Sequence, residues 1–482
     1  MSERKRPNIL LFVTDQQQER ITRSDYPSIL PRLERFANEG VRFGQMFTTM
    51  AHCCPSRASL FTGLYPSQHG VYNNVSNPQA LSVGLRHDVA TFAERLSENG
   101  YSLYFSGKWH ISSTENPQDR GWTELNVTAG KDSFMSTTVE QWRKVHPTLG
   151  NNPRSRGALL RPGWRPYQLY GESDRHYLSD NEVVKAAERK IRELRDAQEP
   201  WCMYVGVLAP HDPFFALKEY IEAYDPKQMP LPYNYRDQLL DKPAYFRRMR
   251  NLFDQLSESE VRECIAHYLA LNSQVDDMFG RVLDALESTG QADDTLVIFM
   301  SDHGESLGAH GLFLKGISPY DETYRIPCIM RWPNGINQSG RVVDELTSIM
   351  DIAPTIIEVA QAETRSPMSG QSLAPFFHSA HVPTWRDTVY SQCNGVEIYF
   401  TQRIVRTKQF KLVYNPTDVD ELYDLESDPY EMANLSDNPK FTDIKYELFR
   451  RLWQNAAQVN DTLFGDYPTV AMAPYGPALA LQ

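Results

Sequence analysis

Short apolar segments alternate with amphipathic helical patterns along the first two thirds of this chain. Residues 7–14 form a continuous apolar run, which is typical of a strand buried on both faces of a parallel sheet. Helical periodicity extends over Asn181 to Ala197 and over Ser257 to Thr289. A strand-like segment follows each of them, at Trp201 to Leu208 and at Thr295 to Ser301. The alternation predicts an α/β fold with a doubly wound, mostly parallel sheet flanked by helices.

Two further stretches complete the expected core. Val89 to Asn99 is expected to form a helix with Asp88 as its N-cap, and Tyr101 to Ser106 to form a strand. Residues 113–175 are rich in Pro, Gly, Arg and Trp and show little periodicity. We therefore expect a long irregular insertion there, of the kind that walls an active site.

The character of the sequence changes near residue 380. Short alternating segments follow, namely Val389 to Ser391, Glu397 to Thr401, Arg403 to Thr407 and Phe410 to Tyr414. They predict a small antiparallel sheet, and a helix is expected from Thr442 to Val459. We expect a catalytic α/β domain over residues 1–380 and a C-terminal subdomain over residues 381–482.

The composition excludes several classes of protein. The chain has 482 residues, and 49 basic against 61 acidic side chains give a net charge of −12, so the broad cationic surface of a nucleic-acid binder is absent. No apolar stretch of about 18 residues exists, so we expect no membrane span. The first apolar run is too short for an export signal and the six cysteines are sparse, which favours the cytoplasm. A chain of this size is expected to form a homo-oligomer.

Polar side chains stand where two of the expected strands end. Asp15 and Gln16 follow the first strand, and Asp302 and His303 follow Thr295 to Ser301. Ligands bind beyond the carboxyl ends of strands in open α/β sheets. Mostly oxygen donors with one imidazole suit Ca²⁺, Mg²⁺ or Mn²⁺. The alternative is that Asp15 only caps a helix after its strand.

The segment Cys53 to Gly63 predicts an unusual helix start. Pro55 is well placed in a first helical turn, which puts Cys53 at the N-terminus. The helix dipole there lowers a thiol pKa and attracts anions, and Arg57 adds an anion clamp one turn later. The alternative is a buried structural cysteine beside a helix cap.

The pattern Cys-x-Pro-Ser-Arg followed by Thr-Gly closely resembles the signature of type I sulfatases, in the alkaline phosphatase superfamily. In that family the first cysteine of the motif, here Cys53 and not Cys54, is oxidised to Cα-formylglycine. The resemblance extends in order through most of the chain. It includes Pro7 to Asp15, Gly107 to His110, Ala209 to His211, Ser301 to Glu305, Lys315, Met350 to Thr355 and Glu421 to Leu425 with Asp428-Pro429.

The resemblance implies a site, its cofactors and its partners. The implied metal ligands are Asp15, Gln16, residue 53, Asp302 and His303, and the implied catalytic residues are Cys53, Arg57, Lys108, His110, His211 and Lys315. Many members have Asp-Asp where this chain has Asp15-Gln16, and Asp-Asn where it has Asp302-His303. We expect one divalent cation, with Ca²⁺ preferred and Mn²⁺ or Mg²⁺ open. A formylglycine-generating enzyme is the implied maturation partner.

The resemblance also implies a mechanism. The aldehyde of residue 53 is hydrated, and one hydroxyl, with Asp302 as base, attacks sulfur in line. The metal, Arg57, Lys108 and Lys315 neutralise the sulfuryl oxygens. His211 or Lys315 protonates the leaving oxygen, and the second hydroxyl, deprotonated by His110, expels sulfate.

The same residues help to distinguish the alternative functions. A phosphonate monoester or phosphodiester hydrolase of the same superfamily is the nearest alternative, although its members tend to lack the lysine–histidine pair of Lys108 and His110. A non-catalytic binding protein and a plain cysteine hydrolase are disfavoured by the retained site residues. The leaving group is open, and we expect a small-molecule or saccharide sulfate ester. Weaker candidates for site roles are His52, Asn73, Asn74 and His310, whereas Trp109 is expected to pack.

Overall fold

An eight-stranded sheet forms the centre of the computed structural model, which describes residues 6–77, 79–128, 154–161, 164–174, 179–364, 366–396, 398–465, 472 and 475–482. The strand order is β13-β2-β12-β11-β1-β9-β4-β5. These strands are β1 (Asn8–Thr14), β2 (Val41–Phe43), β4 (Ser102–Lys108), β5 (Thr123–Thr128), β9 (Trp201–Gly206), β11 (Thr295–Ser301), β12 (Cys328–Arg331) and β13 (Arg341–Val343). β12 runs antiparallel to both of its neighbours, and the other pairs are parallel. The predicted mostly parallel sheet is confirmed.

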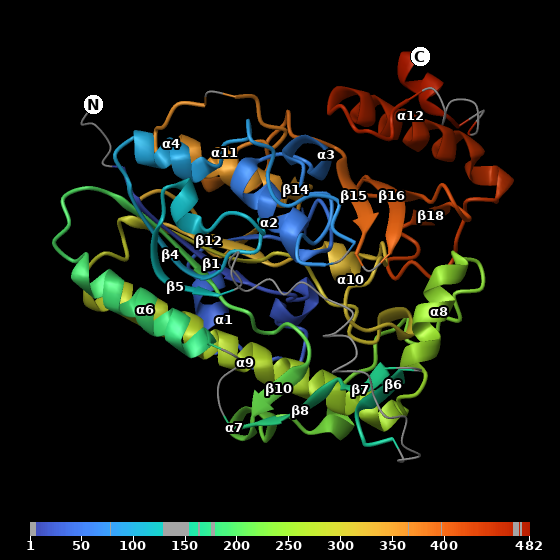
Figure 1. Ribbon diagram of the computed structural model, residues 1–482, viewed down its shortest axis with the longest axis horizontal. Coiled ribbons are helices and arrows are strands. Elements are labelled where there is room, and N and C mark those ends of the chain that lie inside the picture. Colours follow the sequence, from blue (N-terminus) through green and yellow to red (C-terminus); the bar gives the residue numbers. More distant parts are fainter. Residues whose placement is uncertain are drawn as a thin grey trace.

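The side chains of β1 alternate between two hydrophobic layers. Leu10 and Phe12 belong to one buried cluster, and Ile9, Leu11 and Val13 belong to another. Helices α1 (Pro31–Asn38), α6 (Asp180–Glu193) and α9 (Glu258–Ser288) cover the first face, and α2 (Cys53–Thr62), α4 (Phe92–Glu98) and α11 (Ile352–Val359) cover the second (Figure 1). A strand that is buried on both faces reads as a continuous apolar run, which explains why its sequence predicted it so clearly.

One predicted helix begins later than expected. α4 starts at Phe92 with Thr91 as its N-cap, and the predicted start at Val89 with Asp88 as cap is wrong. The backbone N–H of Thr91 donates to Oε2 of Glu94 at 2.5 Å, which closes a capping box. This reciprocal pair satisfies the free donors of the first turn, so the helix begins there.

The expected irregular insertion contains regular structure. β5 lies inside it and pairs in parallel with β4, so it is the edge strand of the main sheet. The insertion also holds β6 (Ala158–Arg161), β7 (Trp164–Gln168) and β8 (Tyr170–Ser173). Residues 129–153 lie outside the described part of the chain. The expectation of irregularity is therefore wrong for β5 and for β6 to β8, which gain stability from partners that the local sequence does not reveal.

A separate four-stranded antiparallel sheet follows, with the order β15-β16-β17-β18. Its strands are β15 (Val389–Gly395), β16 (Tyr399–Arg406), β17 (Phe410–Tyr414) and β18 (Glu421–Asp424), and α12 (Thr442–Gln458) packs against them. The two segments predicted over 397–407 form one strand, β16. The predicted small antiparallel sheet is confirmed, and in Figure 1 it lies at one end of the molecule beneath α12. The boundary near residue 380 stays a prediction.

Shorter elements connect these layers. They include α3 (Pro66–His69), α7 (Lys218–Ile221), α8 (Ala244–Phe253), α10 (Asp321–Tyr324) and the short strands β3 (Met46–Phe47), β10 (Phe214–Leu217) and β14 (Thr347–Ser348). Within the described residues, every helix is too short or too polar to cross a lipid bilayer.

Candidate active site

Asp15 and Asp302 follow two neighbouring parallel strands of the main sheet. β1 and β11 pair in register up to Thr14 and Ser301, so the next residue of each strand leaves the sheet at the same edge. Both aspartate side chains are fully buried. The two strand ends therefore bring Asp15 and Asp302 together at the edge of the sheet where open α/β sheets bind ligands.

Helix α2 brings Cys53 to the same place. The helix begins at Cys53 with Pro55 in its first turn and ends at Gly63, whose φ of 70° forms the left-handed cap. Cys53 Sγ faces the aspartates, whereas Cys54 belongs to the apolar layer under the helix. Only the first of the two cysteines therefore reaches the site.

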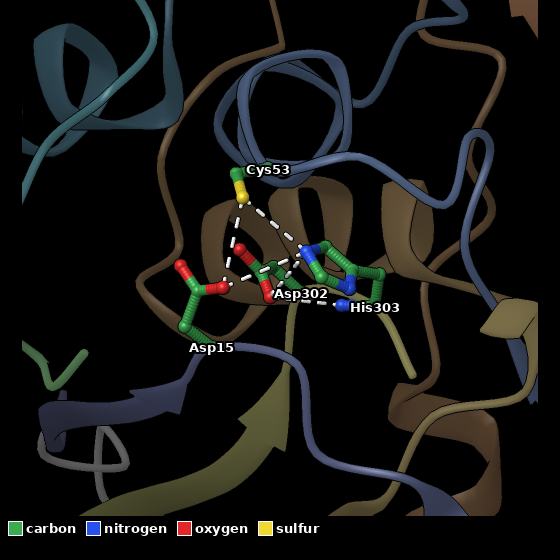
Figure 2. Close-up of side chains that lie close together, drawn as sticks. All are labelled: Asp15, Cys53, Asp302 and His303. Atoms are coloured by element: carbon green, nitrogen blue, oxygen red, sulfur yellow. Dashed lines mark hydrogen bonds and ion pairs between the residues drawn. The ribbon is translucent and has the colours of Figure 1, made fainter. Parts of the chain in front are cut away.

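Four side chains from three separate segments converge within a few ångströms (Figure 2). Cys53 Sγ lies 3.3 Å from Nε2 of His303 and 3.6 Å from Oδ1 of Asp15. Nε2 of His303 lies 3.5 Å from Oδ1 of Asp15 and 3.8 Å from Oδ1 of Asp302. One ligand atom from each residue falls within 4.8 Å of all the others. Such a set of donors can hold a metal ion.

The imidazole of His303 has a fixed orientation. Its Nδ1 lies 2.9 Å from the carbonyl oxygen of Gly304, so Nδ1 carries the proton and donates it. Nε2 then faces the cluster. Metal-binding histidines in proteins usually donate their other ring N–H to a partner of this kind.

Arg57 holds the two carboxylates in place. Its Nε donates to Oδ2 of Asp302 at 2.8 Å, and its Nη2 donates to Oδ2 of Asp15 at 3.1 Å. Nη1 donates to the hydroxyl of Tyr204 and to the carbonyl of Lys108, whose ammonium also donates to Oδ2 of Asp15. These bonds make Arg57 a positioning residue, and its predicted contact with sulfuryl oxygens stays a prediction.

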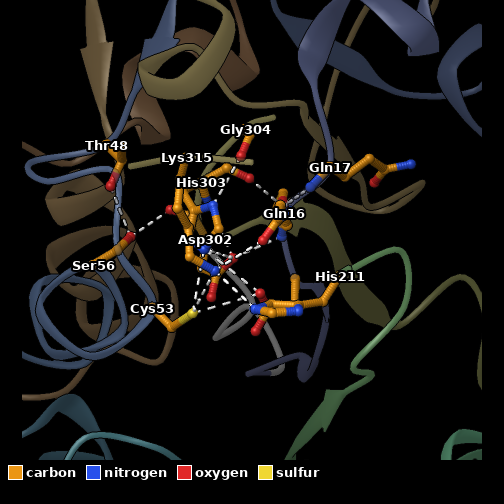
Figure 3. A network of polar contacts seen from close by, with 12 residues as sticks. Gln16, Gln17, Thr48, Cys53, Ser56, His211, Asp302, His303, Gly304 and Lys315 are labelled. Carbon is orange, nitrogen blue, oxygen red and sulfur yellow. Dashed lines mark hydrogen bonds and ion pairs between the residues drawn. The ribbon is translucent and has the colours of Figure 1, made fainter. Parts of the chain in front are cut away.

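Lys315 contacts both His211 and Cys53 (Figure 3). Nζ of Lys315 lies 2.8 Å from Oε1 of Gln16, 2.8 Å from Nε2 of His211 and 3.5 Å from Sγ of Cys53. His211 is partly open to solvent, with 27% of its side-chain area accessible. A substrate oxygen that enters from solvent can therefore reach His211 and the lysine beside it.

Gln16 is oriented by two carboxylates that sequence reasoning gave no role. Its Nε2 donates to Oε2 of Glu305 at 2.6 Å and to Oδ1 of Asp212 at 3.1 Å. Burial and the charge of Asp212 raise the pKa of Glu305 to about 7 against the N–H donors around it. The sequence signals for Glu305 were its position two residues after His303 and its place at the end of the segment Ser301 to Glu305, which is part of the resemblance.

His110 lies at the edge of the site. Its Nε2 is 3.2 Å from the hydroxyl of Ser76, and its backbone has a φ of 58°. Burial and the ammonium of Lys108 lower its pKa to about 4, against the raising effect of Cys53. A neutral imidazole at neutral pH is suited to accept a proton.

Several weaker candidates have structural roles. Asn73 closes a turn through the backbone of residues 79 and 81, and Asn74 accepts a backbone N–H from α2. Nδ1 of His310 lies 2.7 Å from Oδ2 of Asp237, which places it in a loop contact. Trp109 is buried among aromatic rings, as predicted.

Cations control the charge of the cluster. Burial raises the pKa of Cys53, but Lys108 and Lys315 outweigh it and hold that pKa well below its ordinary value. Burial and the charge of Cys53 also act to raise the pKa of Asp15, and Lys108 and other cations outweigh them and lower it. Burial raises the pKa of Asp302, although Arg57 opposes it. The anionic donors of the site therefore lie close to the cations of Arg57, Lys108 and Lys315.

The chain matches two protein-family models. One is described as Sulfatase and covers residues 7–362, and the other is described as N-sulphoglucosamine sulphohydrolase, C-terminal and covers residues 308–458. The chain is 30% identical to the uncharacterized sulfatase YidJ of Escherichia coli (strain K12), over 95% of this chain and 88% of that protein. It is 28% identical to a choline-sulfatase of Rhizobium meliloti (strain 1021), over 90% of this chain and 83% of that protein.

Solved structures share the fold. One, described as a complex with its substrate D-glucosamine-2-N,6-O-disulfate, has a TM-score of 0.73 and 23% identity and covers 95% of this chain and 99% of that chain. A phosphonate monoester hydrolase from Silicibacter pomeroyi has a TM-score of 0.77 and 23% identity, over 94% of this chain and 95% of that chain. At this identity the likeness shows the architecture alone.

Proposed function

Because the chain belongs to the sulfatase family and is a sulfuric ester hydrolase, we propose that it cleaves a sulfate monoester with a formylglycine formed from Cys53 and one divalent metal ion. The observation that carries the proposal is the convergence of Cys53 Sγ with Oδ1 of Asp15 and Nε2 of His303, at 3.6 and 3.3 Å. Three distant segments supply these groups, so the cluster is not a product of local sequence.

The residues fit a divalent cation. Arg57 and Lys108 engage Oδ2 of Asp15, which leaves Oδ1 directed at the cluster. We infer that Asp15, Gln16, residue 53, Asp302 and His303 hold the ion, with Ca²⁺ preferred and Mn²⁺ or Mg²⁺ as alternatives. When bound, the cation would neutralise sulfuryl charge and activate the nucleophile.

The chain's own cations and imidazoles have separate tasks. The hydrated formylglycine supplies one hydroxyl to attack sulfur and a second to release sulfate. The ammonium groups of Lys108 and Lys315 lie beside residue 53 and stabilise the charge that moves onto the sulfuryl oxygens. His211, or Lys315 beside it, gives a proton to the leaving oxygen. His110, which is neutral at neutral pH, accepts the proton of the second hydroxyl.

The proposed substrate is a small-molecule or saccharide sulfate ester. A structure with the same fold binds a disulfated glucosamine, and a relative is named as a choline-sulfatase. In this chain His211 lies on the exposed side of the site. Beside it, the hydroxyl of Tyr167 donates a hydrogen bond to Oδ2 of Asp212. These groups can accept or donate hydrogen bonds to a hydroxylated leaving group. The six free cysteines support a location in the cytoplasm, and a homo-oligomer stays a prediction.

A phosphonate monoester or phosphodiester hydrolase is the second candidate. The similar fold of a phosphonate monoester hydrolase favours it, whereas the Gln16 and His303 pair is shared by relatives that resemble phosphonate monoester hydrolases and by relatives that resemble choline sulfatases. The presence of both Lys108 and His110 favours sulfate. The two candidates differ in which ester is turned over faster by the same site.

The test combines mass spectrometry and a substrate panel. The chain is produced together with a formylglycine-generating enzyme, and the mass of the peptide that contains Cys53 and Cys54 is measured. We expect residue 53 alone to lose H₂S and gain oxygen, and sulfate monoesters to be hydrolysed faster than phosphonate monoesters or phosphodiesters. Cys53→Ser should abolish turnover, and Cys54→Ser should preserve it. Full turnover by a protein whose Cys53 is still a thiol would overturn the proposal, and faster phosphonate hydrolysis would favour the second candidate.

A further inference from the structure

The unmodified side chains around Cys53 form a different donor set from that of the mature enzyme. Without conversion, the pocket contains one thiol sulfur, one imidazole nitrogen and two carboxylates, from Cys53, His303, Asp15 and Asp302. All four residues are buried. Sulfur and nitrogen donors suit Zn²⁺, whereas Ca²⁺ and Mg²⁺ take oxygen.

The spacing of the donors matches a tetrahedral zinc site. Metal–ligand distances of about 2.3 Å for sulfur and about 2.0–2.2 Å for nitrogen and oxygen separate tetrahedral donors by about 3.3–3.6 Å. Here the separations are 3.3 Å for Cys53 and His303, 3.6 Å for Cys53 and Asp15, and 3.5 Å for His303 and Asp15. Nε2 of His303 lies 3.8 Å from Oδ1 of Asp302. Three of the four donors therefore already have tetrahedral spacing, and the fourth, from Asp302, lies within 4.8 Å of the others.

Supporting contacts already aim these donors. The carbonyl oxygen of Gly304 accepts a hydrogen bond from Nδ1 of His303, and Arg57 and Lys108 donate to Oδ2 of Asp15. Nζ of Lys315 lies 3.5 Å from Cys53 Sγ, where it can donate to a metal-bound thiolate. Partners of this kind raise metal affinity because they hold the ligands in one orientation.

We propose that the unconverted chain binds one Zn²⁺ through Asp15, Cys53, Asp302 and His303, and that conversion of Cys53 changes this pocket from a zinc site into a site for a harder cation. The second half rests on the proposed function. The physical reason is the loss of the sulfur donor, since only oxygen atoms remain at residue 53 after conversion. Zinc in the thiol form would occupy the pocket of a protein that cannot yet use the formylglycine mechanism.

The test uses the full chain made without the maturation enzyme. Mass spectrometry first establishes that Cys53 is a thiol, and a chelator removes metals. Zn²⁺ is then titrated against a chromophoric chelator, and Co²⁺ is added to a second sample as a spectroscopic probe. We expect one equivalent of Zn²⁺ to bind, and Co²⁺ to give the intense visible bands of a tetrahedral site with a thiolate charge-transfer band in the near ultraviolet.

Variants identify the sulfur donor. Cys53→Ser should weaken Zn²⁺ binding by more than about 100-fold, because losing a ligand costs more than losing a partner that supports a ligand, and should remove the charge-transfer band. Cys54→Ser is the matched control and should change neither. A Co²⁺ complex of the unaltered chain without the thiolate band would overturn the proposal, and that measurement does not depend on any variant folding.

The converted chain tests the second half separately. It should bind Ca²⁺ or Mn²⁺ and bind Zn²⁺ at least about tenfold more weakly than the thiol form does. Equal Zn²⁺ affinity in both forms would overturn the change in preference. Failure of the converted enzyme to hydrolyse sulfate esters would instead overturn the proposed function, and it would leave the zinc result of the thiol form standing.

Discussion

Nε2 of Gln16 donates to Oε2 of Glu305 at 2.6 Å, while Oε1 of the same amide accepts from Nζ of Lys315 at 2.8 Å. An ammonium only donates hydrogen bonds, so Lys315 fixes which end of the amide is the oxygen. Gln16 therefore presents its oxygen to Lys315 beside Cys53, and its NH₂ faces Glu305 and Asp212. The other oxygen of Glu305 is held by the backbone N–H groups of Leu307 and Leu314.

Glu305→Gln should disturb this amide. The oxygen of the new side chain would stay with the two backbone N–H groups, so its NH₂ would face the NH₂ of Gln16, and reversing Gln16 would instead set two donors against each other at Lys315. We expect metal affinity, measured by calorimetry, to fall by about 10- to 100-fold, as is usual for supporting partners of a metal ligand. The double variant Gln16→Glu with Glu305→Gln restores an acceptor opposite a donor and should recover part of the loss. Unchanged affinity in Glu305→Gln would contradict this role.

Arg57→Ala should destabilise the metal-free protein strongly. Arg57 has no accessible side-chain area and bridges two carboxylates that are also fully buried. Removing one partner of a buried ion pair costs about 3–5 kcal/mol, because the remaining charges lose their compensation. Urea unfolding in chelator should show this loss, and a bound divalent cation should recover part of it. Arg236→Ala, at a guanidinium with 82% exposed side-chain area, is the control and should stay within about 0.5 kcal/mol of wild type. A similar small effect at Arg57 would contradict the structure.

Gly107→Ala should disturb the strand that carries Lys108. Gly107 has a φ of 104°, and a Cβ there would clash with the carbonyl oxygen of Gly206 on the neighbouring strand. The expected loss in the free energy of unfolding exceeds about 2 kcal/mol, and turnover should fall because the lysine moves. Gly100→Ala separates the two causes, since Gly100 has a φ of 81° but an added Cβ would meet no atom within 4 Å. Equal losses at the two glycines, from denaturant curves, would show that the close contact is unimportant.

Asp321 makes folding stability depend on pH. It pairs with Arg406 at 2.8 Å and with Lys411 at 3.1 Å, both in the C-terminal sheet. Burial acts to raise its pKa, but these cations outweigh burial and hold that pKa far below the ordinary value. A carboxyl with a lowered pKa stabilises the fold fully above about pH 4, and that contribution is lost as the pH falls through the folded pKa.

Asp321→Asn should therefore lose about 3–5 kcal/mol at neutral pH, because the buried Arg406 loses its paired carboxylate and Lys411 keeps only Glu431. Its stability should also vary less than that of wild type between about pH 4 and pH 2. Asp196→Asn, at an exposed site, is the control and should follow the wild-type pH curve. If the curve of Asp321→Asn ran parallel to wild type through this range, Asp321 would not be the titrating group.

The elements that the sequence predicted best are those whose local pattern is also their tertiary environment. β11 and β17 have the predicted bounds, because their runs are apolar or alternating over their whole length. β5 was missed because it is a partly exposed edge strand whose formation depends on pairing with β4. The start of α4 was misplaced because the Thr91 and Glu94 capping box outweighed Asp88.

Three features could be predicted without the structure: the α/β class, the strand ends that carry Asp15 and Asp302, and the cysteine at a helix start. Those features follow from periodicity and from short motifs, which are local. The tertiary structure alone decided what these groups touch: Arg57 turned toward the carboxylates, and Glu305 was placed against Gln16, 289 positions away in the chain. Hydrogen-bond partners between distant segments depend on how strands and helices pack, and no local pattern encodes that packing.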